Sequence, residues 1–405
     1  MDRISSGQIQ ETLKFRGLPF KDHLTKILGP LVEEHQPDSR NRTYPPEVVV
    51  HSMVFQALAS EGSLKAAVAR NNADRVAAGL EPASMNTGSY SNARRRLNGD
   101  VIREASQEVS RNAEQQAPGG WYWKDFSVKA IDGSTITADD TSENQRQFPQ
   151  SDQQDAGLGF PILRIVLLQS LVTGMVENVN FGSYSGKETG EMALARPLIE
   201  GLKEGDLLLG DRYYPSFFLI AELLLRGVQG VFQSHASRNL DYRKGRSLGK
   251  LDHIVQWERP RRPDWMSEEE YHRFPKSIEV RELDVTDAIG SEDRVSIVTT
   301  LLDAEEYSKT ELLTLYKRRW GIELAIRDIK ETMDFNHICA QTPDMVNKEI
   351  WAHILAYNLV RWYIANSAAV GGVSVDGISV SAAKYIILAN VSNILNARNL
   401  SGLHA

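Results

Sequence analysis

The sequence predicts an α/β protein with a helical N-terminal domain. Over residues 1–120 the apolar residues recur at helical spacing, as they do in 48–58. From residue 121 onward, short apolar runs alternate with longer amphipathic stretches, which is typical of strands followed by helices. We therefore expect a mixed sheet flanked by helices after the N-terminal domain.

The elements of the second part can be placed from their apolar runs and from Pro and Gly residues. In chain order we expect strands at 128–132, 162–169 and 171–181, a helix at 187–202, a strand at 207–211, a helix at 215–227 and a strand at 228–233. Residues 235–293 interrupt this alternation with a basic stretch that contains Pro and Trp, and 294–301 returns to a strand pattern. No internal repeat or low-complexity segment is present.

One helix is expected to run from residue 308 through residue 330. Residues 308–311 have the form of a capping box, and an apolar series at helical spacing follows them. At about 100° per residue, one narrow face of this helix carries Tyr316, Arg319, Glu323 and Lys330. A carboxylate beside a phenol, a guanidinium and an ammonium can hold a divalent metal and a phosphodiester. The alternative is a surface helix whose Glu and Lys side chains only pair with each other.

Two isolated aspartates follow short apolar runs. Asp132 ends the run 127–132, and Asp211 ends the run 207–211, so each is expected at the end of a buried strand. A carboxylate is costly there unless a positive charge meets it, and a shared metal ion would supply that charge. The alternative for each is a structural Asp that caps the following turn.

These segments together resemble the DDE transposases of bacterial insertion sequences, in the group defined by a Tyr-Arg-Glu-Lys signature (the insertion-sequence-four family). The resemblance runs from about residue 45 to about residue 365. It rests on three motifs, which are Asp132-Gly-Ser-Thr, Gly210-Asp211-Arg-Tyr-Tyr-Pro and Tyr316-(2)-Arg319-(3)-Glu323-(6)-Lys330. The third motif is specific because four residue types stand at fixed spacing, whereas the first two are weak when taken alone.

The resemblance implies a domain organisation and a catalytic triad. It implies a ribonuclease-H-like catalytic core, to which we assign residues 121–234 and 294–365. It also implies a β-rich inserted subdomain at 235–293, and it leaves 366–405 as a short C-terminal tail. The catalytic and metal-binding triad would be Asp132, Asp211 and Glu323, and the N-terminal domain 1–120 would bind the DNA ends.

The resemblance further implies cut-and-paste DNA transposition. The cofactor would be Mg²⁺, for which Mn²⁺ can substitute, as two ions about 3.5–4 Å apart. Strand nicking would lead to a DNA hairpin, with Tyr316, Arg319 and Lys330 positioning its phosphates. Tyr316 as a covalent nucleophile is a competing but weaker idea, because that chemistry needs no acidic triad. The partners would be double-stranded DNA, terminal inverted repeats and target DNA, bound by a homodimer.

Charge and aromatic residues add candidates for DNA contact. The net charge of −7 excludes a uniformly basic DNA-coating protein, so contacts must come from local patches. One candidate patch is Arg94, Arg95 and Arg96, and a second, within 238–262, includes Arg243, Lys244 and Arg246. Such charge runs can equally be solvated surface. Trp320 could stack on an unpaired base but is expected in the core, and Trp257 and Trp265 are candidates to trap a flipped base.

The remaining composition bounds the class and compartment. With 41% hydrophobic and 24% charged residues the chain has the balance of a folded protein, not a disordered one. A single cysteine, Cys339, excludes an internal disulfide, and the nine histidines show no spacing suited to zinc, so oxygen ligands are expected for a catalytic metal. No signal peptide and no apolar run of about 18 residues is present, so we expect a cytoplasmic protein without a membrane span.

Two other functions remain open from the sequence. A nuclease on the same fold would cut DNA without joining ends, and a catalytically silent transposase derivative would bind DNA without needing the acids.

A long basic C-terminal region for subunit pairing is not evident after residue 366.

Overall fold

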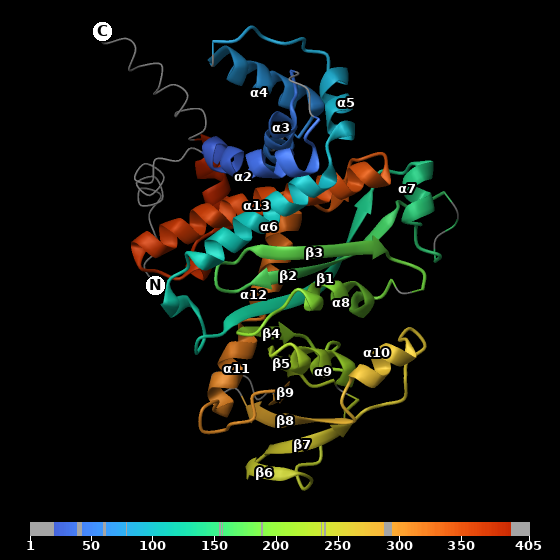
Figure 1. Cartoon of the computed structure of the whole chain (residues 1–405), viewed down its shortest axis with the longest axis vertical. Coiled ribbons are helices and arrows are strands. Elements are labelled where there is room, and N and C mark those ends of the chain that lie inside the picture. The colour runs from blue at the N-terminus through green and yellow to red at the C-terminus, as the bar shows by residue number, and fades with distance from the viewer. Residues whose placement is uncertain are drawn as a thin grey trace.

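A computed structural model describes most of the chain. The described residues are 20–38, 43–59, 62–77, 79–153, 155, 157–187, 189–235, 237–238, 240–286 and 294–389. Within them, a helical layer lies over one edge of a long mixed sheet, and the far end of that sheet carries the hairpins that follow residue 240 (Figure 1).

The described strands form a single sheet. In chain order they are β1 (Ser127–Ala138), β2 (Ile162–Ser170), β3 (Val176–Ser183), β4 (Asp206–Gly210), β5 (Gln229–Gln233), β6 (Arg246–Gly249), β7 (Asp252–Glu258), β8 (Ser277–Thr286), β9 (Arg294–Thr299) and β10 (His337–Ile338). Their order across the sheet is β3-β2-β1-β4-β5-β9-β8-β7-β6, and β10 pairs with β1 off this path. β1, β2 and β3 are antiparallel neighbours, whereas β4 and β5 run parallel to β1. This is the ribonuclease-H strand order, and the predicted fold class is confirmed.

Strand β1 is longer than predicted, and this corrects the position of Asp132. The apolar run ends at Asp132, but β1 continues to Ala138 because β2 pairs with it from Lys129 to Thr137. On its other edge, β1 pairs with β4 only over 127–130 and with β10 only over 137–138. Asp132 therefore lies in the middle of a strand, at the place where one edge is unpaired.

The inserted segment contains strands, as predicted, but they extend the core sheet. β8 pairs with β9 over six residues, β7 pairs with β8, and β6 closes the edge as a short hairpin with β7. A short helix, α10 (Glu268–Arg273), connects β7 to β8. A bidentate ion pair fixes β7 to β8, since the Arg281 guanidinium donates to both Asp252 carboxylate oxygens at 2.8 and 2.7 Å.

The helical layer is built mainly around one long helix. The N-terminal helices are α2 (Phe20–His35), α3 (Pro46–Leu58), α4 (Leu64–Ala77), α5 (Gly88–Arg96) and α6 (Gly99–Gln115). α13 (Pro343–Gly371) packs against α6 and α3, and Figure 1 shows α13 and α6 side by side above β3. α13 opens with Thr342, whose hydroxyl accepts from the Met345 amide, and with Pro343 in the first turn, where its missing N–H costs nothing.

The two faces of the sheet carry two different hydrophobic cores. Side chains alternate along β1, so that Ala130 and Ile136 face one core while Ile131 faces the other. The first core includes Ile322 of α12 (Trp320–Arg327) and the second includes Leu198 of α8 (Glu191–Glu200). Asp132 shares the parity of Ala130 and therefore lies on the α12 side of the sheet.

The predicted single helix at 308–330 is wrong, because the segment has three parts. α11 (Lys309–Lys317) is followed by a tight turn, then by α12, then by the π-helical turn η2 (Asp328–Thr332). At the first junction the Arg318 and Arg319 amides donate to carbonyls three residues back instead of four. The Ser308 capping box does begin α11 as predicted, since its hydroxyl accepts from the Glu311 amide and the Glu311 carboxylate accepts from Ser308.

The other described helices connect the strands. They are η1 (Gly119–Trp121), α7 (Ser142–Gln147), α9 (Phe217–Leu225) and η3 (Val375–Gly377). Residues 380–389 are also helical. Of the predicted tail 366–405, residues 390–405 lie outside the described part of the chain.

Candidate active site

The gap between β1 and β4 positions the two aspartates. β4 ends at Gly210, so Asp211 leaves the sheet beside the stretch of β1 that β4 no longer pairs with. The Asp211 Oδ1 accepts from the Tyr213 amide at 2.8 Å, which turns the chain sharply after the strand. The Asp132 Oδ1 accepts from the Gly133 amide at 2.9 Å. Both carboxylates therefore have one oxygen tied to the backbone and one oxygen free to bind elsewhere.

Arg319 links the catalytic helix segment to β1. Its Nη2 donates to Glu323 Oε1 at 2.6 Å, and its Nη1 lies 4.0 Å from Asp132 Oδ2. Its guanidinium carbon lies 5.7 Å from the centre of the Tyr316 ring. The Tyr316 hydroxyl in turn donates to Gln233 Oε1 at the end of β5, at 3.2 Å. The structure thus brings Tyr316, Arg319 and Glu323 together, as their spacing suggested, and places Asp132 beside Arg319, which spacing could not predict.

Lys330 is separated from the rest of the Tyr-Arg-Glu-Lys signature. It lies in η2, and among the described residues its ammonium makes no hydrogen bond or ion pair with Tyr316, Arg319 or Glu323. Burial lowers the pKa of Lys330, and no acidic side chain acts in the opposite direction. An ammonium that is half-buried and unpaired is well suited to bind an anion that the free protein lacks.

A fourth carboxylate, Glu191, completes the site and was missed in the sequence. It begins α8, and its Oε1 accepts from the buried Tyr214 hydroxyl at 2.7 Å. A Cβ on Gly133 would lie 2.6 Å from the Glu191 carboxyl carbon, so any larger residue at that position would displace this carboxylate. Gly133 and Tyr214 belong to the first two motifs, and the structure explains both by their contact with Glu191. Its own sequence surroundings give no signal.

The groups that disfavour a negative charge on Asp132 outweigh the groups that stabilise it. Burial, the largest cause, raises the pKa of Asp132 to about 6. The charges of Glu191 and Asp211 act in the same direction, while the Gly133 amide and the Arg319 guanidinium act against it. Burial, followed by the charge of Glu191, also raises the pKa of Tyr214 well above its usual value. The site as folded therefore favours an added positive charge among its carboxylates.

The carboxylates fit divalent cations bound by oxygen. All the candidate ligands are Asp or Glu oxygens, which Mg²⁺ and Mn²⁺ prefer over sulfur or imidazole sites. Within the described residues, Asp132, Asp211 and Glu323 are not among the clusters whose ligand atoms all lie within 4.8 Å of one another.

Comparisons with known proteins agree with this geometry. The family described as "Transposase DDE domain" matches residues 123–359, which include both aspartates and Glu323. The chain belongs to this family. It is a DDE transposase, and thus a polynucleotidyl transferase of a family that typically works with divalent metal ions.

Two comparisons show how much of the chain is similar to known proteins. The chain is 27% identical over 332 residues to the "Transposase InsG for insertion sequence element IS4" of Escherichia coli (strain K12), covering 81% of this chain and 72% of that protein. A solved structure, the "piggyBac transposase synaptic complex with hairpin DNA", is similar with a TM-score of 0.46 and 11% identity, covering 94% of this chain and 78% of that one.

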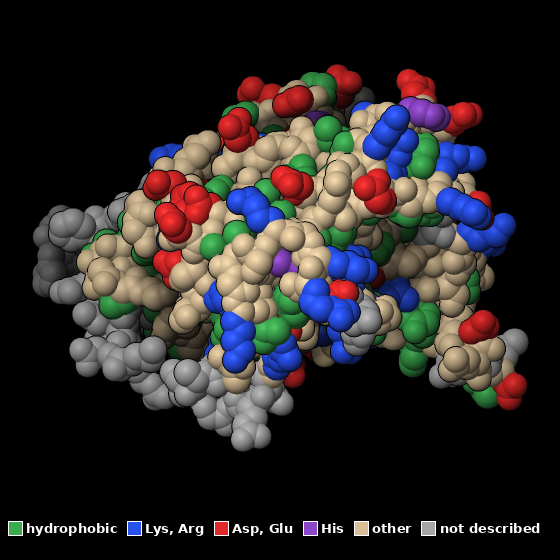
Figure 2. Space-filling model, turned by 90° about the horizontal axis from the view of Figure 1, so that it is seen from below, with side chains coloured by type: hydrophobic (Ala, Val, Ile, Leu, Met, Phe, Trp, Pro, Cys, Tyr) green, Lys and Arg blue, Asp and Glu red, His purple; other side chains and the backbone are tan. Residues whose placement is uncertain are grey.

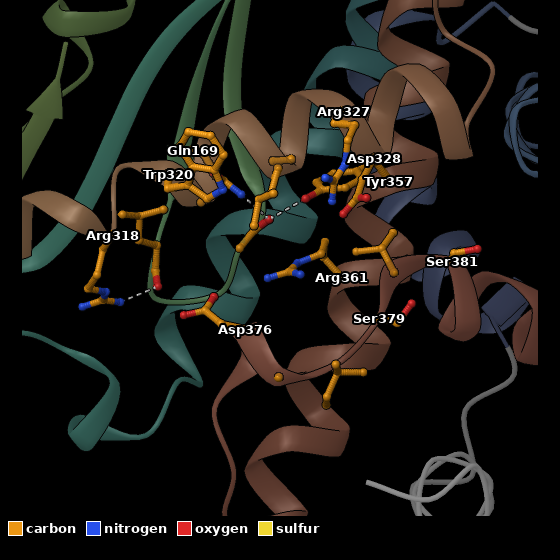
Figure 3. Close-up of a pocket in the computed structure, with 18 of the residues that line it drawn as sticks. Gln169, Arg318, Trp320, Arg327, Asp328, Tyr357, Arg361, Asp376, Ser379 and Ser381 are labelled. Atoms are coloured by element: carbon orange, nitrogen blue, oxygen red, sulfur yellow. Dashed lines mark hydrogen bonds between the residues drawn. The ribbon is translucent and has the colours of Figure 1, made fainter. Parts of the chain in front are cut away.

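Trp320 of this transposase is exposed, so its predicted place in the core is wrong. The side chain is 59% exposed because the tight turn at Arg318 and Arg319 rotates α12 relative to α11. Trp320 borders a pocket of about 920 Å³ on the side of α12 away from the carboxylates, together with Arg318, Arg327 and Arg361 (Figure 3). A base stacked on Trp320 would therefore lie beside the acidic site and not within it.

The two other tryptophans differ in accessibility. Trp257 is 8% exposed, its Nε1 donates to Glu282 at 2.9 Å, and the Arg238 guanidinium covers its ring at 3.5 Å. It is a structural residue in this conformation. Trp265 is 41% exposed, with the Arg196 guanidinium 3.4 Å from its ring centre, and is the more accessible candidate to meet a base.

The basic patches also divide into structural and exposed residues. Arg94 is mostly buried and pairs with Glu349 at 3.3 Å, whereas Arg95 and Arg96 are exposed. Arg243 is 90% exposed, and Lys244 and Arg246 are exposed beside it. Figure 2 looks onto the end of the molecule that holds β6 and β7 and shows several groups of Lys and Arg side chains there.

No helix in the described part of the transposase is both long enough and apolar enough to cross a membrane.

Proposed function

We propose that this chain catalyses cut-and-paste DNA transposition by metal-dependent phosphodiester hydrolysis and strand transfer through a DNA hairpin. The observation that supports this most is the convergence of Asp132 and Asp211 with the Arg319–Glu323 pair at the unpaired stretch of β1. In this proposal the N-terminal helices bind terminal inverted repeats, and two copies act together on the paired ends and the target DNA.

Each residue of the site has a separate task in this mechanism. Asp132, Asp211 and Glu323 hold two Mg²⁺ ions, for which Mn²⁺ can substitute. When bound, the ions activate the attacking oxygen and stabilise the leaving oxygen of the phosphodiester. Arg319 exchanges its bond with Glu323 for a DNA phosphate, and the Tyr316 hydroxyl donates to a neighbouring phosphate oxygen.

Two further side chains, Glu191 and Lys330, also have tasks in this mechanism. Tyr214 holds one oxygen of Glu191, so this fourth carboxylate keeps a fixed orientation beside Asp132. Lys330 offers an unpaired ammonium further along the segment, at η2. It is placed to receive the phosphate of a strand that bends away from the metal ions.

Incubation with an end-labelled duplex that carries the element's terminal repeat tests the proposal. Nicked strands, hairpins and, with target DNA, joined products are expected in Mg²⁺. Nicking without any joined product would favour a nuclease of the same fold. Binding without cleavage, unchanged by Asp211→Ala, would favour a silent DNA-binding derivative.

Arg319→Ala or Lys330→Ala is expected to impair hairpin formation more than nicking. Neither side chain can bind a metal cation, so the acids keep their ions, but a bent phosphate backbone loses its positioning, at a cost of up to about 10²-fold in rate. The ratio of nicked strand to hairpin should rise on an end-labelled duplex. Arg327→Ala is the matched control, since Arg327 is exposed on the same segment but borders the pocket away from the acids. Equal losses of nicking and hairpin would make Arg319 and Lys330 general substrate binders.

Replacing Arg243, Lys244 and Arg246 together by Ala is expected to weaken binding to DNA ends and to flatten its salt dependence. If all three contact phosphates, the slope of log K against log salt should fall by about 2.7. Binding titrations at several salt concentrations measure this slope. The control removes three exposed cations that lie outside both the N-terminal helices and the inserted segment, namely Arg146, Lys203 and Arg327. An unchanged slope in the first variant would show that this cluster is only solvated.

A further inference from the structure

Three potential metal ligands of different chemistry meet at the far end of β1. β10 pairs parallel with β1, with Thr137 opposite His337, so the residues that follow each strand come together. His337 is the first residue of the short strand β10, and Cys339 directly follows that strand. One ligand atom from each of Asp139, His337 and Cys339 lies within 4.8 Å of the other two. This cluster is separate from the carboxylates around Asp132.

The hydrogen bonds of His337 orient one ring nitrogen toward this cluster. The Thr137 hydroxyl lies 2.9 Å from His337 Nδ1 and also donates to the Asn336 carbonyl at 3.3 Å. His337 Nε2 then faces Asp139 Oδ1 at 3.0 Å. The ring is thereby oriented with Nε2 toward the Asp139 carboxylate, and a metal ion can replace the proton that these two groups share. A cation between them would satisfy both groups, and the Thr137 hydroxyl on Nδ1 would take the place of the hydrogen-bond acceptor that orients a metal-bound histidine.

The electrostatic surroundings favour a cation at this place. The Glu349 Oε1 accepts from the Cys339 amide at 3.0 Å, so a second carboxylate besides Asp139 lies beside the cluster. Arg94, paired with the other Glu349 oxygen, is the opposing charge. Cys339 is exposed, so an ion can reach the cluster from solvent without any opening of the fold.

We propose that Asp139, His337 and Cys339 bind one Zn²⁺-class ion, with water in the fourth position. Tetrahedral bonds of about 2.0–2.3 Å separate ligand atoms by about 3.5 Å, so small side-chain rotations suffice to close the cluster. Sulfur and imidazole ligands select Zn²⁺ or Co²⁺ over Mg²⁺ and Mn²⁺, which distinguishes this site from the oxygen site at Asp132. Sequence spacing gave no zinc signal, because one ligand directly follows β1 and the other two lie far along the chain.

The ion would cross-link the end of β1 to the end of the catalytic segment. β10 begins shortly after η2, which carries Lys330, and β1 carries Asp132. A metal at this junction therefore fixes the distance between the strand and the segment that together form the acidic site. The role is structural, and it does not depend on the proposed transposition reaction.

Cobalt titration of the chelator-treated full chain under a non-thiol reductant tests the site. One Co²⁺ per chain should give a thiolate-to-cobalt charge-transfer band in the near ultraviolet, and Zn²⁺ should remove the band by competition. Cys339→Ser should abolish the band, and His337→Gln or Asp139→Asn should weaken Co²⁺ binding more than about tenfold. Thr137→Val should weaken binding about tenfold through the loss of the hydroxyl on Nδ1. Zn²⁺ should raise the melting temperature of the wild type but not that of Cys339→Ser.

Two controls keep the result specific. His35→Gln alters another described cluster, with Glu34 and Glu104, that has no sulfur, and it should leave the band unchanged. Asp132→Ala alters the acidic site and should also keep the band, which separates this proposal from the transposase mechanism. Circular dichroism of each variant checks its fold. Absence of a band at saturating Co²⁺ would overturn the proposal, as would unchanged affinity in both His337→Gln and Asp139→Asn.

Discussion

Asp132→Ala, Asp211→Ala or Glu323→Ala is expected to reduce Mg²⁺- or Mn²⁺-dependent DNA cleavage by at least about 10³-fold. Each carboxylate would supply oxygens that hold a catalytic ion, and an ion held by two acids instead of three loses the position on which charge stabilisation depends. The three residues come from β1, from the end of β4 and from α12, so no two of them can replace the third.

DNA binding should remain almost unchanged in these variants, because the acids hold metal and do not contact the duplex. Cleavage is measured on an end-labelled duplex, and binding is measured by gel shift with the same DNA in Ca²⁺. Glu269→Ala removes an exposed acid on α10 and serves as the control for net charge. Full cleavage by any one of the three variants would remove that residue from the triad.

Asp132 and Asp211 could be predicted from the apolar runs that precede them, but the end of the strand could be predicted only for Asp211. The apolar run 207–211 ends where β4 ends, because nothing pairs with the chain beyond Gly210. The run 127–132 ends six residues before β1 does, because pairing with β2 carries the polar residues onward as a strand. Local hydrophobicity locates a strand but cannot tell how far a neighbour extends it.

In the segment that carries the Tyr-Arg-Glu-Lys signature, the sequence predicted contacts only between residues three or four positions apart. Arg319 and Glu323 stand four apart inside one turn and do pair, as their spacing suggested. Tyr316 stays beside Arg319 because a tight turn with bonds three residues apart brings positions i and i+3 into line. Lys330 lies beyond a change to π-helical winding, and helical angles summed across two irregular turns lose their meaning. The tight turn at Arg318 and Arg319 also exposes Trp320 to solvent.

Contacts between distant segments gave no sequence signal. Glu191 reaches Gly133 and Tyr214 only because α8 packs on β2 and β3, and nothing around Glu191 announces this. The sequence gives equally little indication of the polar contacts that hold the start of β1. Lys129 stands between Val128 and Ala130 in an apolar run, and these neighbours do not indicate its partners.

Lys129 is the centre of a buried ion cluster. Its side chain is 4% exposed, and its Nζ donates to Glu114 of α6 at 3.0 Å and to Glu177 of β3. Asp206, the first residue of β4, lies 4.0 Å away. Burial disfavours the Lys129 charge, but Glu177, Glu114 and Asp206 outweigh it and raise the pKa of Lys129. One ammonium thus joins four elements at the end of β1 that precedes Asp132.

Lys129→Met is expected to lower the free energy of unfolding by about 3–5 kcal/mol, because it leaves the half-buried Glu114 and Glu177 and the buried Asp206 without a cation. Urea denaturation followed by circular dichroism measures the loss. Lys203→Met, which removes an exposed lysine just before β4, should change stability by less than about 0.5 kcal/mol. Adding Glu177→Gln to Lys129→Met should recover part of the loss, since one buried charge is then removed.

The pH dependence of the Lys129→Met variant gives an independent check. Burial already raises the pKa of Glu177 and of Asp206 in the wild type, and Lys129 opposes both shifts. Without Lys129 these folded-state pKa values rise further above their unfolded values, so the folded variant binds protons that the unfolded chain releases at neutral pH. Its deficit should therefore shrink as the pH falls toward the folded pKa values and grow as the pH rises. A deficit that is small and independent of pH would mean that water reaches the three acids, and the start of β1 would then be held by apolar packing alone.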